Sequence, residues 1–138
     1  DEVGSRGLGD VYKRQPDIIN DRIVLNNSKT GQSIYNQFCI ACHQSDGRGD
    51  SPRFPTLVDT DWVNGDKKRL LNLTINGMEG PIKVNGETFD GLMPQHSFLN
   101  DKEIADVLTY IRTNFGNNSS PITFQEVAEF RKTNSRFK

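Results

Sequence analysis

The clearest hydrophobic pattern in this chain lies in its C-terminal third. Asn100 and Glu103 form the N-x-x-E arrangement of a capping box, and Leu99 is placed to form a hydrophobic staple with Ile104. The pattern predicts a helix over residues 101–115 that ends at the following glycine. Its apolar side chains recur every three or four residues, as on one face of an α-helix, at Ile104, Val107, Leu108, Ile111 and Phe115.

Two segments nearer the N-terminus also carry apolar side chains at helical spacing. The first predicts a helix over 29–42 with Ser28 as its N-cap. The second predicts a helix over 66–76, capped by Asn64 or Asp66 and stopped by an Asn-Gly pair. The inner faces of the two helices, in chain order, consist of Ile34, Tyr35, Phe38 and Cys42, and then Leu70, Leu71, Thr74 and Ile75.

Two short elements are predicted beside the long helix. An Asn-Gly pair at positions 85–86 separates two runs that are compatible with strands, which predicts a β-hairpin over 82–89. Thr123 and Glu126 form a second capping box, which predicts a final helix over 124–132. We expect this helix to dock on the body of the protein through Val127, Phe130 and Phe124.

The N-terminal segment is excluded from the predicted domain. Residues 5–15, SRGLGDVYKRQ, resemble a translated sequencing adapter, so we expect residues 1–15 to be an artefact. Residues 16–27 are polar without clear periodicity and are interpreted as a linker. On this interpretation the natural N-terminus is missing, the absence of a signal peptide carries no information, and further domains or a lipid anchor can precede the segment. The alternative is a natural N-terminal arm.

The strongest chemical signal is the C-x-x-C-H sequence formed by Cys39, Cys42 and His43, which is the attachment motif of c-type haem. Two thiols one helical turn apart match the two haem vinyl groups, with which they form thioether bonds. The imidazole that follows is placed to be the proximal ligand of the iron. Three alternative interpretations of the motif fit less well. A zinc ribbon needs four ligands, and the chain has only two cysteines and two histidines, of which His96 lies far from the motif. A redox dithiol should open a helix that follows a strand, and a disulfide across so short a loop is strained.

Composition agrees with a single domain that carries a large apolar cofactor. Only 33% of the 138 residues are hydrophobic, which is low for a globular domain, and a covalently bound haem would supply the missing apolar surface. The net charge of −1 gives no reason to expect nucleic acid or an anionic membrane as a partner. No apolar run approaches the 18 residues of a membrane-spanning helix.

Three side chains are candidates for the second axial ligand of the iron. Met93 is favoured because Pro94 keeps it out of a helix and in an extended loop. Met78 is the second methionine, alternatively a gap-filling side chain at the haem rim, and His96 is most simply a surface residue. Ligation by histidine and methionine raises the reduction potential relative to two nitrogen ligands.

The order of motifs resembles a class I c-type cytochrome. It runs G-x-x-x-Y-x-x-x-C-x-x-C-H, then F-P-x-L, then G-x-M-P, then a helix containing V-L-T-Y-I-R. The resemblance covers about residues 28–116 and implies an all-α fold around one covalent haem c, here with a small β-hairpin before the methionine loop. The domain is expected over 28–133, with 117–133 as a C-terminal helical extension. In this family a glycine and an aromatic residue of the first helix pack on an aliphatic and an aromatic residue of the last, here Gly31, Tyr35, Val107 and Tyr110.

The resemblance also implies residues that support the haem. The carbonyl of Pro55, or failing that of Pro52, is expected to accept the second ring N–H of the proximal histidine. Trp62 and Arg69 are the candidate donors to the haem propionates; the alternative is ordinary packing for Trp62 and a solvated helix face for Arg69. His43 and Met93 are expected on opposite walls of a slot lined by Phe54, Leu57, Leu71, Ile75 and Leu108.

The function expected from this resemblance is one-electron transfer without bond-making chemistry. The nearest likeness is to bacterial cytochrome subunits or domains that serve periplasmic dehydrogenases and reductases. It implies a periplasmic or periplasm-facing location and transient redox partners: a dehydrogenase or reductase as donor and a cytochrome or oxidase as acceptor. The alternatives are the C-terminal domain of a larger oxidoreductase and, more remotely, a haem sensor or peroxidase, which would need a labile or absent sixth ligand.

Overall fold

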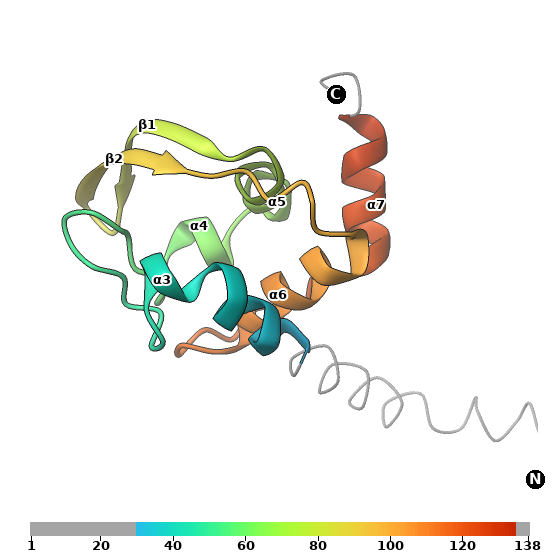
Figure 1. Cartoon of the computed structure of the whole chain (residues 1–138), viewed down its shortest axis with the longest axis horizontal. Helices are drawn as coiled ribbons and strands as arrows, with labels where there is room; N and C mark the ends of the chain where they lie inside the picture. The colour runs from blue at the N-terminus through green and yellow to red at the C-terminus, as the bar shows by residue number, and fades with distance from the viewer. Residues whose placement is uncertain (1–29, 135–138) are drawn as a thin grey trace, which may run out of the picture.

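The structure, a computed structural model, describes residues 30–134 as a set of helices with one two-stranded hairpin (Figure 1). The segments interpreted as adapter and linker, 1–15 and 16–27, lie outside this part of the chain, as does the predicted N-cap Ser28. Within residues 30–134 no helix combines the length and the apolar character that crossing a bilayer requires.

The first described helix covers residues 30–38 and continues, after a turn at Cys39, into α3, Ile40–His43. The predicted helix over 29–42 is therefore present, with an interruption inside the C-x-x-C-H motif. Its helical hydrogen bonding is nevertheless retained across the interruption, because the His43 backbone N–H donates to the Cys39 carbonyl at 3.0 Å.

Two helices follow the loop after the motif, α4 (Asp61–Asn64) and α5 (Lys67–Asn76). The predicted cap of α5 is Asp66, whose side chain accepts from the backbone N–H of the second helical residue. Thr60 caps α4 in a similar way. Helix α4 was not predicted, because four residues are too few to show a helical period.

The hairpin consists of β1, Met78–Val84, and β2, Glu87–Met93, paired antiparallel around the predicted Asn-Gly turn. It is longer than the predicted 82–89. The extra pairs were not predicted because β1 contains Gly80 and Pro81 and β2 contains Gly91, and neither residue type favours a strand. As a result Met93 lies at the end of a strand, not in an irregular loop, and it pairs directly with Met78.

Both predicted capping boxes are present. Helix α6 spans Asp101–Thr113 and begins with the Asn100–Glu103 box, and α7 spans Phe124–Thr133 and begins with the Thr123–Glu126 box. Helix α6 ends two residues earlier than predicted, because its C-cap Asn114 is extended and Phe115 and Gly116 then adopt positive φ. The expectation that Phe124 docks α7 was wrong: its side chain is 53% exposed, and the buried neighbours are Ile122, Val127 and Phe130.

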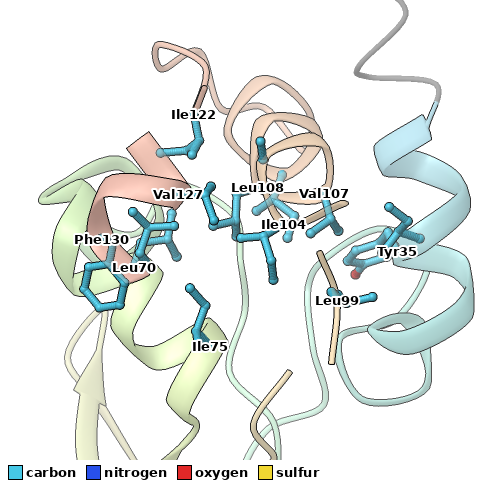
Figure 2. Packing of buried hydrophobic residues seen from close by; sticks show 14 of the residues in the cluster. Tyr35, Leu70, Ile75, Leu99, Ile104, Val107, Leu108, Ile122, Val127 and Phe130 are labelled. Atoms are coloured by element: carbon cyan, nitrogen blue, oxygen red, sulfur yellow. The ribbon is translucent and has the colours of Figure 1, made fainter. Parts of the chain in front are cut away.

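Helix α6 runs through the middle of the core, with Tyr35 of the 30–38 helix on one side and residues of α5 and α7 on the other (Figure 2). The 30–38 helix crosses α6 at Gly31, where an added Cβ would lie 2.1 Å from the Asp106 carbonyl oxygen. The Tyr35 and Tyr110 rings lie 5.7 Å apart beside this crossing. The glycine and the two tyrosines thus pack as the resemblance implied.

Candidate haem site

The C-x-x-C-H motif forms one wall of a cleft. Cys39 lies at the turn between two helices, and Cys42 follows one helical turn later, so both thiols reach the same space. Both cysteines are free thiols and half-buried. Burial, followed by the influence of Cys42, raises the pKa of Cys39 to about 11. A thiol of this kind is protonated at neutral pH, unlike the reactive cysteine of a redox dithiol, whose pKa is lowered.

His43 closes the motif and is 9% exposed. Its Nδ1 lies 3.0 Å from the carbonyl oxygen of Pro55, the first of the two prolines nominated from the sequence. A carbonyl oxygen can only accept, so Nδ1 carries the proton and Nε2 keeps a lone pair that can bind a metal. Burial lowers the pKa of His43, which favours the same neutral imidazole. Pro52, the second candidate, is exposed.

The loop after the motif lies close to His43. The Gly49 backbone N–H donates to the His43 carbonyl at 2.9 Å, and the Leu57 N–H donates to Gly47 at 2.6 Å. Gly49 has φ of 74°, and an added Cβ would lie 2.4 Å from the Phe54 carbonyl oxygen. Only glycine allows this close approach, which brings the Pro55 carbonyl to the imidazole.

The cleft has a volume of about 250 Å³ and is lined mainly by apolar side chains. Three of the five residues expected to line it, Phe54, Leu57 and Leu108, do so. The expectation for Leu71 and Ile75 was wrong, since they are buried in the core and the cleft is bordered by other residues of the same helix. One side of helix α5 faces the core and another faces the cleft, and the helical spacing of apolar residues does not show which side faces which. Its cleft-lining residues are Leu70, Leu73 and Thr74.

The hairpin contributes residues that were not predicted to line the cleft. Ile82, Val84 and Phe89 do so, and Val84 and Phe89 are also buried. Ile82 and Val84 could have been identified from the sequence, because residues two positions apart lie on the same face of a strand.

All three candidates for the second axial position line the cleft. Met78 and Met93 do so together because they are partners in the hairpin register. The backbone N–H of His96 donates to the Thr74 carbonyl at 3.0 Å, and its ring lies 5.6 Å from that of Phe98. The Nδ1 of His96 is buried without a hydrogen-bond partner, and burial lowers the pKa of this ring.

Trp62 and Arg69, the candidate propionate donors, have protein partners. The Trp62 Nε1 donates to the Lys83 carbonyl at 2.8 Å. The Arg69 guanidinium lies 4.4 Å from the centre of the Trp62 ring, and its Nη2 donates to Asp61 Oδ2 at 2.6 Å. Trp62 lines the cleft. Binding of the propionates by these two side chains stays a prediction.

Comparison with known proteins identifies the family. The family model described as cytochrome c matches residues 28–115. Cytochrome c-552 of Thermus thermophilus is 34% identical over 110 residues, which cover 73% of this chain and 83% of that protein. The gluconate 2-dehydrogenase cytochrome c subunit of Pantoea cypripedii is 33% identical over 114 residues, 78% of this chain but 25% of that subunit. The CcoP subunit of the cbb3-type cytochrome c oxidase of Rhodobacter capsulatus is 27% identical over 93 residues, 64% of this chain and 31% of that subunit.

The residues of the cleft fit the haem c that this family implies. Two free thiols one helical turn apart stand beside an imidazole whose Nδ1 is hydrogen-bonded and whose Nε2 is free to bind iron. Apolar side chains border the same space, as a large apolar ring requires. The chain belongs to the cytochrome c family, and its function is electron transfer through covalently bound haem c.

Proposed function

We propose that this domain carries single electrons through one haem c attached to Cys39 and Cys42, with His43 and Met93 as the axial ligands of the iron. The haem supplies an iron that accepts and releases one electron. The observation that carries the proposal is the hydrogen bond of 3.0 Å between His43 Nδ1 and Pro55, because it leaves Nε2 as the only ring atom that can ligate.

The protein's own residues perform three tasks in this proposal. The Pro55 carbonyl fixes the orientation and tautomer of the imidazole. The apolar walls exclude water, which disfavours the more highly charged oxidised state of the site. Met93 supplies a neutral thioether, which raises the potential further relative to a nitrogen ligand. Met93 is preferred to its strand partner Met78 because Pro94 follows it and fixes the chain there.

Spectroscopy of the oxidised protein tests the axial assignment. Sulfur ligation of ferric haem gives a weak far-red absorption band, which Met93→Ala should abolish while lowering the reduction potential. Met78→Ala is the matched control, because it removes the partner methionine in the same register, and it should keep both properties. Loss of the band in Met78→Ala alone would reassign the ligand to Met78, and absence of the band from the unmutated protein would favour His96.

A domain of a larger periplasmic oxidoreductase is the second candidate. The supporting observation is that the matched region spans 25% of a gluconate 2-dehydrogenase cytochrome c subunit and 31% of an oxidase subunit. In that setting a dehydrogenase or reductase gives the electron and another cytochrome or an oxidase takes it. The complete gene with its neighbours tests this candidate: an adjoining dehydrogenase would support it, and a gene for a single secreted domain would contradict it.

A haem sensor or peroxidase needs an open coordination position. The proposed methionine ligation leaves none. Carbon monoxide should therefore leave the spectrum of the reduced protein unchanged. A spectrum altered by carbon monoxide at neutral pH would contradict the assigned role as an electron carrier with two protein ligands.

A further inference from the structure

The chain between β2 and α6 is held in place by contacts with other elements. Residues 94–100, here called the connecting segment, form neither a helix nor a strand, so their backbone groups need partners outside regular secondary structure. The segment directly follows Met93, the last residue of β2, and passes beside α7 before the chain enters α6 (Figure 1). The contacts that hold this segment therefore bear on the position of the proposed ligand.

Helices α5 and α7 both bind the backbone of the connecting segment. From α5, the Thr74 carbonyl accepts from the His96 backbone N–H at 3.0 Å. From α7, Arg131 binds two further carbonyls. Its Nη2 donates to the Leu99 carbonyl at 2.6 Å and to the Ser97 carbonyl at 3.3 Å. The segment is thus fixed from two directions.

Arg131 contacts a third acceptor at the start of α6. Its Nη1 donates to Oδ1 of Asp101, the first residue of that helix, at 2.8 Å, and its side chain is 21% exposed. A planar guanidinium serves all three acceptors at once, whereas the compact ammonium of a lysine does not match this geometry. Leu99 is buried, so water has little access to its carbonyl if the guanidinium is removed.

Helix α7 provides a fixed base for this contact. Its side chains Val127 and Phe130 are buried in the core, so its position does not depend on Arg131 alone. The helix lies outside residues 28–115, the region that the cytochrome c family model matches. Arg131 therefore connects a part of the chain beyond the matched region to the segment beside the proposed methionine ligand.

We propose that Arg131 is a positioning residue for Met93, which it keeps in the sixth coordination position by holding the connecting segment. Ser97 lies only four residues after Met93 in the sequence, so an anchor at that point limits how far Met93 can move when the hairpin opens. This inference rests on the proposed function, because it takes Met93 as an axial ligand. Loss of the anchor should weaken the methionine side and leave the attachment at Cys39, Cys42 and His43 intact.

Imidazole is the probe that measures how firmly Met93 is held. Added to the oxidised, haem-loaded protein, it competes with the thioether, and loss of the far-red band reports the exchange. Arg131→Leu removes every donor and keeps a residue that favours a helix. It should raise the affinity for imidazole about tenfold, the effect of losing hydrogen bonds from one charged group.

Arg131→Lys is the conservative variant. It keeps a positive charge beside Asp101 but lacks the planar arrangement of donors that reaches both carbonyls. The affinity for imidazole should lie between those of the parent and of Arg131→Leu. This variant also carries the test if Arg131→Leu does not fold.

Lys67→Leu is the matched control. Lys67 is another cation that joins α7 to its surroundings by binding both a carbonyl and a carboxylate. Its Nζ donates to the Pro121 carbonyl at 3.1 Å and pairs with Glu126 at 3.0 Å, and neither contact involves the connecting segment. Lys67→Leu should therefore change the affinity for imidazole by less than about twofold.

Urea unfolding followed by far-UV circular dichroism separates this positioning role from a general loss of stability. Equal increases of imidazole affinity in Arg131→Leu and Lys67→Leu would show only that α7 is docked less firmly, and would overturn the inference. An affinity within about twofold of the parent in Arg131→Leu, or in Arg131→Lys where only that variant folds, would overturn it as well. A parent protein without the far-red band would instead contradict the proposed axial ligation itself.

Discussion

The two sides of the cleft are held in place by different means. His43 is attached to helical segments that pack on α6 at Gly31, and its ring and carbonyl are both hydrogen-bonded to the loop that follows. Met93 belongs to the hairpin, in which only Val84 and Phe89 are buried. The hairpin is tied to the rest by contacts near its turn, from Trp62 to Lys83, from Ser51 to Glu87, and from Asn85 to Val58.

This difference indicates which side opens first. Parts of a protein with few buried contacts and exposed hydrogen bonds open locally at a lower cost than the core does. The histidine side is part of the global fold, whereas the hairpin can move away while the helices remain packed. We therefore expect the methionine ligand to be lost before the histidine ligand and before the helices unfold.

The largest expected effect comes from filling the helix crossing. Gly31→Ala should destabilise the protein by about 3 kcal/mol, the upper end of overpacking costs, because the new Cβ would lie 2.1 Å from backbone. Gly91→Ala in the hairpin is the matched control. An added Cβ there meets nothing within 4 Å, so it should change stability by less than about 0.5 kcal/mol.

Urea denaturation followed by far-UV circular dichroism measures both variants. Equal destabilisation by Gly31→Ala and Gly91→Ala would show that the two sides are equally packed. That result would remove the basis of the comparison.

A smaller effect is expected from loosening the hairpin alone. Trp62→Phe removes the hydrogen bond to the Lys83 carbonyl but keeps an aromatic ring for Arg69 to stack on. The cost should be about 1 kcal/mol. On heating, the far-red band of methionine ligation should then vanish at a lower temperature than in the parent, while loss of helix shifts much less. Simultaneous loss of the band and of the helices in both proteins would contradict local opening.

The smallest effect is expected at the ion pair between α5 and α7. Lys67 Nζ lies 3.0 Å from Glu126 Oε2. Burial alone would raise the pKa of Glu126, but the Thr123 N–H and Lys67 outweigh it and lower the pKa. A lowered pKa in the folded state contributes stability above the ordinary value of 4.5, which is lost as the pH falls through the folded value.

Glu126→Gln keeps the capping box and removes only the charge. At pH 7 the free energy of unfolding of the parent should exceed that of the variant by less than about 1 kcal/mol, because the ion pair is partly exposed and solvent screens it. The difference should vanish in acid. A constant difference from pH 3 to pH 7 would show that the charge is not its cause.

Local signals in the sequence predicted the helices well. The Asn100–Glu103 and Thr123–Glu126 boxes each involve residues three apart, so the helix starts could be predicted without knowledge of the fold. Helix α4 was missed because it is one turn long. The full length of the hairpin was missed because its pairing is non-local and its strands contain glycine and proline.

The site was predictable only in part. The spacing of Cys39, Cys42 and His43 indicates haem attachment directly. The resemblance to a family supplied Pro55 as a candidate hydrogen-bond partner of His43. The cleft-facing side of α5 could not be predicted, since the helix is buried on both sides and periodicity reports only burial. The pairing of Met78 with Met93 depends on strand register, which the local pattern did not reveal.

Covalent attachment of haem is the most direct test of the account. Expressed with a cytochrome c maturation system, the protein should retain its haem through acid–acetone extraction, because thioether bonds do not dissociate. The double variant Cys39→Ser, Cys42→Ser should release any haem that it binds. Haem that leaves the unmutated protein during extraction would contradict the claim that these two thiols hold it.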